Sequence, residues 1–259
     1  MAPPIPAPLF AVLLFLGMLI LLEVGRRLGI RRRPRESEGE RGNLGAIEGA
    51  VFALFGLLMA FSFSGAASRF SEKRMLIAEE VNAVETAYLR LHMVSPEAQP
   101  ALRESFRQYV DSRLEIYRTL PDMESARAAM ARSKTLQEEI WTEAVAATRL
   151  PGAHPAAGWL LLPALNNMID IANTRTMALQ AHPPGIVYLL LFCLGLICSL
   201  LAGYRMAIGP RRSWLHILGF TIITVVIVYV ALDIEYPRTG LIRLESADQL
   251  LVELREGMR

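Results

Sequence analysis

Four long windows of the sequence carry no charged residue, although the chain contains 27 Lys and Arg and 25 Asp and Glu. The windows are Leu9–Leu22, Gly49–Ser68, Ile186–Tyr204 and Trp214–Leu232. The last three have the length of about 20 residues that a helix needs to cross the ~30 Å hydrocarbon core of a bilayer. The first reaches that length only if the uncharged residues 5–8 also enter the interface. Because lipid cannot satisfy open backbone groups, the windows predict four membrane-spanning helices.

The first window could be taken for the apolar core of a signal peptide. Residues 1–8 contain no Lys or Arg, however, and such a peptide needs a basic N-terminal region, so we expect a retained membrane helix. The predicted segments are the N-terminus and first transmembrane helix at 1–22, an Arg-rich loop at 23–43, the second transmembrane helix at 44–64, a helical soluble domain at 65–184, the third transmembrane helix at 185–204, a basic loop at 205–213, the fourth transmembrane helix at 214–232 and a C-terminal tail at 233–259.

The inserted domain at 65–184 has apolar residues at every third or fourth position, which is the period of an amphipathic helix. One such stripe consists of Leu102, Phe106, Val110, Leu114, Tyr117 and Leu120. No breaker separates the second span from the domain, so its first helix is expected to continue straight out of the membrane. Ser95, Pro96 and Glu97 indicate the start of the next helix. With no alternating strand pattern, the sequence predicts an all-α fold whose soluble domain is a helical bundle or coiled stalk.

No arrangement typical of an enzyme, a metal centre or a cofactor site is found in the sequence. It has no phosphate-binding glycine loop and no nucleophile elbow. Cys193 and Cys198 share the third window but point in different directions on a helix, so they cannot form a disulfide with each other. A net charge of +2 is too small to indicate nucleic acid. We therefore expect a protein without enzymatic activity, metal or cofactor, which has the lipid bilayer as its partner and does not bind nucleic acid.

The distribution of arginine predicts an orientation. Seven arginines lie in the loop at 23–43 and three in the loop at 205–213, while residues 1–8 have none. Short basic loops stay in the cytoplasm. We therefore expect a multi-pass protein of the cytoplasmic membrane with its Arg-rich loops inside the cell and its N-terminus and helical domain outside.

Two features mark the second span. Glu48 stands one residue before the uncharged window, where an acid is either an ordinary headgroup-layer residue near the positive end of a helix or a functional intramembrane group. Small residues at spacings of three and four let helices approach closely in lipid. These are Gly45, Gly49, Ala53, Gly56 and Ala60. This small-residue stripe fits a contact inside one subunit or a helix that crowds around an oligomer axis.

Three passages carry a family resemblance. The apolar stretch that ends in Arg69, Phe70 and Arg74 resembles the end of the second span in bestrophin channels, where a helix runs into a turn rich in arginine and aromatic residues. The tail residues Asp233, Glu235, Pro237 and Gly240 are similar to the acid, Pro and Gly that follow the last bestrophin span. The run Glu80–Arg90 resembles the bacterial bestrophin-like membrane family, whose function is undefined. The order of spans, helical insert, spans and tail is also similar.

Bestrophins are pentameric anion channels whose second span lines an apolar neck at positions four apart. The resemblance therefore implies a homo-oligomer, by analogy a pentamer, that passes small ions. It places Ala53, Leu57 and Phe61 at the neck and Glu48 at the pore mouth. In two respects the sequence departs from the family: Ala53 is small where the neck carries a bulky residue, and Met75 and Leu76 replace the usual Trp after the Arg turn.

These departures favour an alternative, a non-conducting membrane scaffold or sensor whose helical domain binds a partner. The family also keeps its insert and both termini in the cytoplasm, opposite to the orientation that the arginines predict. We adopt the arginine-based orientation, because that effect acts directly on this sequence.

Overall fold

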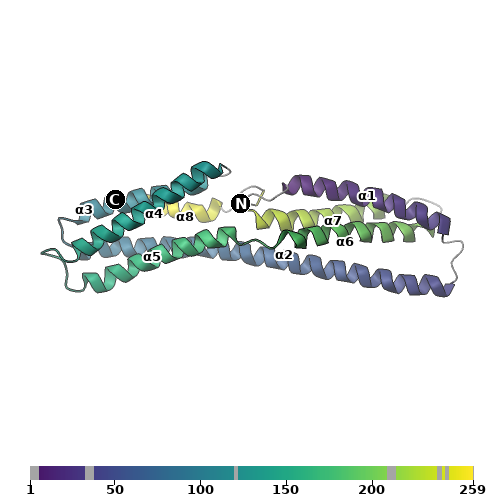
Figure 1. Ribbon diagram of the computed structural model, residues 1–259, viewed down its shortest axis with the longest axis horizontal. Coiled ribbons are helices and arrows are strands. Elements are labelled where there is room, and N and C mark those ends of the chain that lie inside the picture. The colour runs from purple at the N-terminus through teal and green to yellow at the C-terminus, as the bar shows by residue number, and fades with distance from the viewer. Residues whose placement is uncertain are drawn as a thin grey trace. The chain divides into compact units, whose positions relative to one another are not determined.

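The computed structural model describes residues 6–32, 38–119, 122–208, 214–237, 241–242 and 245–258. Most of this part of the chain is helical, and it contains no strand (Figure 1). The helices are α1 Ala7–Arg32, α2 Glu38–Leu89, the short 3-10 helix η2 Arg90–Met93, α3 Gln99–Arg118, α4 Met123–Ala147, α5 Ala157–Gln180, α6 Gly185–Arg205, the 3-10 helix η3 Met206–Ile208, α7 Trp214–Glu235 and α8 Glu245–Gly257. Four of them are long and apolar enough to cross a membrane. The predicted all-α fold with four spans is confirmed.

The helices belong to two compact units. The membrane unit comprises Ala2–Phe70 and His182–Leu241, and the helical unit comprises Ser71–Ala181 and Ile242–Arg259. Helix α2 contributes residues to both units, as the absence of a breaker predicts. The C-terminal helix α8, which the sequence assigned to a separate tail, is part of the helical unit.

The membrane unit is built around a close crossing of α1 and α6, which lie side by side (Figure 1). A Cβ atom on Gly25 would overlap the carbonyl of Leu200, and one on Gly203 would overlap the carbonyl of Leu22. The two backbones therefore touch, which only glycine permits. Helix α7 packs on α1 through Leu14, Met18, Val228 and Leu232, and α2 packs on α6 through Phe55, Leu191 and Cys198.

The helical unit has one continuous apolar core. The predicted stripe of α3 is confirmed for Leu102, Phe106, Val110 and Leu114, which are all buried. The side chain of Tyr117 and residue Leu120 lie outside what the structure describes. The four buried residues meet residues of α2, α4, α5 and α8 in the same cluster, including Val84, Ile140, Leu165, Met168 and Leu251. Each such side chain contributes about 1.5–3 kcal/mol when fully buried, so this core stabilises the unit and docks α8 against it.

The second helix of the insert starts later than the sequence predicted. Helix α3 begins at Gln99, and residues 96–98 form a turn in which the Ala98 amide donates to the carbonyl of Ser95 at 2.9 Å. Pro100 explains the difference. In a helix starting at Pro96, Pro100 would lie beyond the first turn, where it removes a hydrogen bond and its ring clashes with the preceding turn. The observed start places Pro100 within the first turn, where its missing N–H costs nothing.

Two of the passages that resemble the bestrophin family lie on helices in the structure. Arg69, Phe70 and Arg74 lie on the uninterrupted helix α2 and not in a turn, because the sequence offers no proline or turn signal there. Asp233 and Glu235 occupy the last turn of α7, which extends three residues beyond the predicted span. Gly240 of the proposed tail motif lies outside the described residues.

Candidate functional site

One face of the second span lies open in the part of the chain that the structure describes. The side chains of Leu57 and Phe61 are 54% and 67% exposed, and Ala53 is also exposed. The three residues are four apart, so they follow one face of α2. Each span contains an 18-residue apolar window, and the spans differ in the fraction of that window that is buried. This fraction is 11% in the span formed by α2 and 22% to 33% in the other three spans. The positions that resemble the bestrophin neck therefore all lie on the most open surface of the membrane unit.

The small-residue stripe of α2 borders this face. Beyond the adjacent backbone of α2, no described atom lies within 4 Å of where a Cβ would stand on Gly49 or Gly56, and Ala60 is exposed. A Cβ added to Gly45, in contrast, would lie 3.3 Å from Nη2 of Arg205 on α6. Most of the stripe is therefore not used for packing inside one subunit.

The glycines that do pack are ones that the sequence analysis missed. Gly25, Gly29 and Gly203 bring α1 and α6 into backbone contact. The signal for them was available, since Gly25 and Gly29 are four apart at the end of the first span. It is the same pattern as the stripe of α2, so sequence alone could not show which stripe meets a helix of its own chain.

Glu48 lies on the other side of α2 from the open face. It is nine positions, or about two and a half helical turns, before Leu57. Its carboxylate is buried, and its Oε2 lies 3.2 Å from Nε of Arg205 on α6. Oε2 receives no hydrogen bond, so this contact is an ion pair without an aligned N–H. Glu48 thus neutralises an arginine between two spans.

The Arg69 and Glu235 motifs, far apart in sequence, meet in the membrane unit. Nε of Arg69 donates to both carboxylate oxygens of Glu235, at 3.1 and 3.0 Å, and Nη2 donates to Oε2 at 2.7 Å. Glu235 is fully buried, and Arg69 is partly exposed. An acid at a helix C-terminus is opposed by the helix dipole, and the paired guanidinium offsets that cost.

His182 completes this buried cluster. Its Nδ1 lies 3.1 Å from Oε1 of Glu235, and its ring stacks on Tyr236 with centroids 4.5 Å apart. Its Nε2 is buried without a hydrogen-bond partner in the part of the chain that the structure describes. No sequence pattern singles out His182, because the four histidines are widely scattered.

The other tail acid, Asp233, holds the chain after α7. It is buried, and both of its carboxylate oxygens accept from the backbone N–H of Leu241, at 3.1 and 3.0 Å. Pro237, which lies between Asp233 and Leu241 in the chain, is buried as well. The acid and the Pro of the tail motif therefore fix the path of the chain where it leaves the last span.

The helical unit contains a buried ion-pair network around Glu80. Oε1 of Glu80 accepts from Nε of Arg113 and Oε2 accepts from Nη1 of Arg175, each at 2.5 Å. All three side chains are almost fully buried. Nη2 of Arg175 also donates to Asp248 at 3.3 Å. The network joins α2, α3, α5 and α8.

The charges in this network decide the ionisation of Glu80. Burial alone raises the pKa of a carboxylate, because it penalises the charged form. The charges of Arg113 and Arg175 and their hydrogen bonds outweigh that effect, so the pKa of Glu80 is lower than its ordinary value. Glu80 is therefore ionised at neutral pH despite its burial.

The run Glu80–Arg90 now has a physical explanation. Its small residues Ala83 and Ala87 are buried in the core, where they let neighbouring helices approach α2. Tyr88 packs edge-on against Phe106 with ring centroids 5.8 Å apart, and the guanidinium of Arg103 lies 5.1 Å from the Tyr88 ring. These positions of the motif stabilise the helical unit, as does Glu80 itself.

Neither unit presents an arrangement of catalytic or metal-ligating groups in the part of the chain that the structure describes. No three His, Cys, Asp or Glu side chains there are placed to hold a metal ion. Cys198 is buried and Cys193 is exposed, and neither forms a disulfide. The features with functional potential are the open face of α2 and the buried ion pairs.

Comparison with known proteins gives one family. The model of the bestrophin-like domain matches residues 12–248. No curated protein matches the chain in sequence.

Solved structures share the fold. A bacterial bestrophin homologue from Klebsiella pneumoniae, carrying a single substitution, is 16% identical with a TM-score of 0.60, and the match covers 94% of this chain and 98% of that one. A second substituted form of the homologue gives a TM-score of 0.61 at 16% identity, covering 92% and 97%. A further membrane protein structure gives a TM-score of 0.59 at 16% identity, covering 93% and 98%.

Proposed function

The chain belongs to the bestrophin-like family, and we propose that it forms a ring of identical subunits in the membrane whose α2 helices line a pore for small ions. The observation that supports this most directly is the open face of α2, where a bulky apolar pair, Leu57 and Phe61, borders small residues that touch nothing in their own subunit. A pentamer would follow the bestrophin pattern.

The small residues favour a neighbouring helix over lipid on this face. Association in lipid depends on close packing, and glycine or alanine at spacings of three and four allows it. Within this chain the glycines of α1 and α6 serve such a contact. Gly49 and Gly56 have the same character but no partner in the subunit, which fits a surface that neighbouring subunits cover.

Leu57 and Phe61 would then form the narrow part of the pore. Rings of apolar side chains block ions by excluding water, and they conduct when they widen or become polar. Ala53, one turn earlier, would leave the pore wider at its level because its side chain is small. A short apolar constriction of two rings is therefore expected.

The experiment has two parts. The purified protein is first analysed for subunit number in detergent, and we expect a single closed oligomer. Ion flux into vesicles is then measured for the wild type and for the double variant Leu57→Ala, Phe61→Ser, which we expect to raise the flux by at least tenfold.

The matched control is Ile222→Ala with Val226→Ser on α7. These residues are also four apart and 48% and 51% exposed, so the change in lipid-exposed surface is comparable. We expect no increase in flux for the control. A monomer, or a stable oligomer whose α2 double variant passes no more ions than empty vesicles, would overturn the proposal.

One observation favours the alternative of a non-conducting scaffold or sensor. Trp159 at the start of α5 is 84% exposed, and the neighbouring Leu160 is also exposed. Large aromatic side chains on an open surface are typical centres of protein–protein contacts. If the α2 double variant fails the flux test, this surface of the helical unit becomes the first place to look for a partner.

A further inference from the structure

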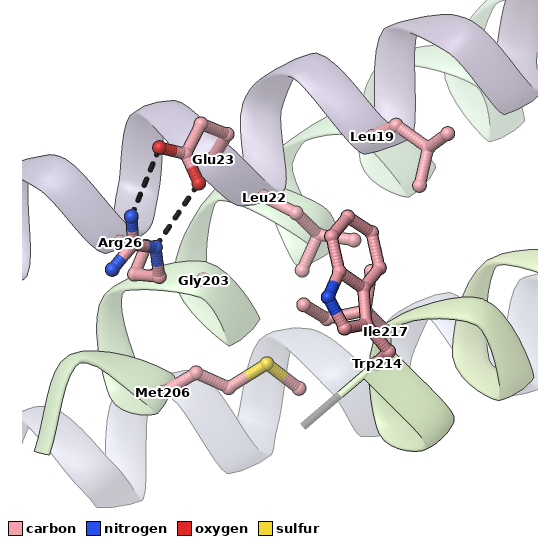
Figure 2. A pocket seen from close by; sticks show the side chains of 8 residues that line it. All are labelled: Leu19, Leu22, Glu23, Arg26, Gly203, Met206, Trp214 and Ile217. Carbon is pink, nitrogen blue, oxygen red and sulfur yellow. Dashed lines mark hydrogen bonds and ion pairs between the residues drawn. The ribbon is translucent and has the colours of Figure 1, made fainter. Parts of the chain in front are cut away.

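A cavity of about 130 Å³ lies in the membrane unit between α1, η3 and the start of α7. Figure 2 shows its lining, which includes Leu19, Leu22, Arg26, Met206, Trp214 and Ile217. Its walls are apolar except at one end, where Glu23 and Arg26 lie next to each other. Nothing in the proposed pore involves this cavity.

The cavity lies at the level where the hydrocarbon gives way to lipid headgroups. Leu22 is the last residue of the first uncharged window, and Trp214 is the first residue of the fourth. Gly203 of the lining is one residue before the end of the third window. Tryptophan is enriched at this depth because its ring is amphipathic. The apolar walls therefore lie at the depth of the acyl chain segments nearest the headgroups, and the charged end lies at the depth of the headgroups.

The α1 side of the cavity is rigid. A Cβ on Gly203 would overlap the carbonyl of Leu22, so α1 and α6 are in backbone contact beside the cavity. This backbone contact fixes the wall that α1 and α6 form together, so a ligand binds there without first ordering that wall.

The charged end carries an excess of positive charge. Glu23 accepts from Nε and Nη2 of Arg26, at 3.0 and 3.1 Å, and from Nε of Arg27 at 2.8 Å. One carboxylate is thus shared by two guanidinium groups. Arg31 and Arg32 follow on the same helix, and both are exposed. A group complementary to this end is anionic, and arginine suits phosphate oxygens in particular.

We propose that this cavity binds one anionic phospholipid of the surrounding bilayer. Its phosphate lies at Arg26 and Arg27, and its glycerol and first methylene groups occupy the space between Leu19, Met206 and Trp214. The bilayer supplies this ligand at the right depth and orientation. Basic pockets between transmembrane helices are the kind of site that anionic headgroups occupy.

Trp214 provides the readout. The chain has three tryptophans, and Trp141 and Trp159 belong to the helical unit. In a variant with Trp141→Phe and Trp159→Phe, fluorescence reports only on the cavity. The protein is reconstituted into phosphatidylcholine vesicles containing increasing fractions of a lipid brominated near its headgroup, which quenches a tryptophan on contact. We expect brominated phosphatidylglycerol to reach half-maximal quenching at roughly one tenth the fraction that brominated phosphatidylcholine requires, because two arginines favour the anionic lipid.

Three variants distinguish a specific site from diffuse electrostatic attraction. Arg26→Gln with Arg27→Gln should abolish the preference for phosphatidylglycerol. Arg31→Gln with Arg32→Gln removes the same charge farther along α1 and should retain most of it. Leu19→Phe, which fills the cavity without changing charge, should also abolish the preference.

Three outcomes would overturn the proposal. They are equal quenching by the two lipids in the otherwise unsubstituted protein, an equal loss of preference in both arginine pairs, and displacement of brominated phosphatidylglycerol by millimolar inorganic phosphate, which would indicate a site for the free anion.

Discussion

Arg69 and Glu235 are 166 residues apart in the chain and form a bidentate ion pair that ties α2 to the end of α7. Glu235 is completely buried, while Arg69 retains some contact with solvent. Each residue belongs to a different passage that resembles the bestrophin family. Their contact gives both passages one physical role, which is to fix the second span against the fourth.

We expect Glu235→Gln to destabilise the protein by about 2–3 kcal/mol, because Arg69 is left without this carboxylate. The loss is somewhat smaller than for a fully buried pair, since Arg69 is partly exposed to solvent. Thermal unfolding in detergent measures the effect. The double variant Arg69→Gln, Glu235→Gln should be more stable than the sum of the two single changes predicts, since neither charge then remains buried alone. Additive effects would show that the pair does not contribute as a unit.

The network around Glu80 leads to a second prediction. Glu80→Gln should destabilise the helical unit by about 3–5 kcal/mol, because Arg113 and Arg175 stay buried without that carboxylate. Its neighbour Glu79 is exposed, so Glu79→Gln is a matched control that should change stability by less than about 0.5 kcal/mol. Limited proteolysis of the helical unit and thermal unfolding both report the difference.

The same network predicts a dependence on pH. The pKa of Glu80 is lowered in the folded protein, so its contribution to stability is present above the unfolded value of about 4.5 and is lost as the pH falls through the folded pKa. The wild type should therefore lose stability below about pH 4.5 more steeply than Glu80→Gln. Parallel curves for the two proteins would contradict the role assigned to Glu80.

Glycines in the two kinds of surface should respond differently to substitution. Gly203→Ala forces apart the backbones of α1 and α6 and should destabilise the subunit itself by roughly 1–3 kcal/mol or more. Gly56 is exposed, and a Cβ added there would have no neighbour within 4 Å beyond the adjacent backbone of α2. Gly56→Leu should therefore leave subunit stability nearly unchanged while weakening the oligomer. Thermal unfolding and subunit number, measured on both variants, distinguish the outcomes. A Gly56→Leu oligomer as stable as the wild type would show that this face contacts lipid.

Glu48 provides a test of the pore geometry. Because it faces Arg205 on the opposite side of α2 from Leu57, we expect Glu48→Gln to lower stability modestly and to leave the reversal potential of any conductance unchanged. Recordings in bilayers under a salt gradient measure that potential. A shift would place Glu48 at the pore mouth after all, where rings of acids select ions.

The orientation in the membrane is tested by labelling. We expect the Arg-rich loops to be cytoplasmic and the helical unit to lie outside. Cys193 and Cys198 are first replaced, and a single cysteine is then introduced either at Ser37 or at Ala146, whose side chain is exposed. Intact cells that carry each variant are treated with an impermeant thiol reagent. Ala146→Cys should react and Ser37→Cys should not. The reverse result would show that the bestrophin orientation applies.

The sequence predicted the parts of the fold that depend on local chemistry. Uncharged windows identify spans because charge is excluded from hydrocarbon, and the stripe from Leu102 to Leu114 identifies a buried helix face because its period is that of the helix. The start of α3 was predicted wrongly because Pro96 was taken as the first-turn proline, although Pro100 is compatible only with the later start at Gln99.

What depends on long-range contact could not be predicted from the sequence. Glu80 and Glu79 look alike in sequence, although one is buried between two arginines and the other faces solvent. Arg69 and Glu235 were recognised separately, and nothing in either passage indicates that they meet. The glycines of α1 and those of α2 follow the same spacing, and only the structure shows which of them already have a partner.

The crossing of α1 and α6 has a consequence for how the protein is made. Gly25 leaves the ribosome long before Gly203, and Arg69 precedes Glu235 by 166 residues. At a synthesis rate of about 5–20 residues per second, the early helices wait roughly 8–30 seconds for the later ones. During that interval most of the helical unit emerges, while α1 and α2 have neither of their main partners. Membrane insertion of this chain therefore depends on keeping two unfinished spans apart from other proteins until the second half of the chain arrives.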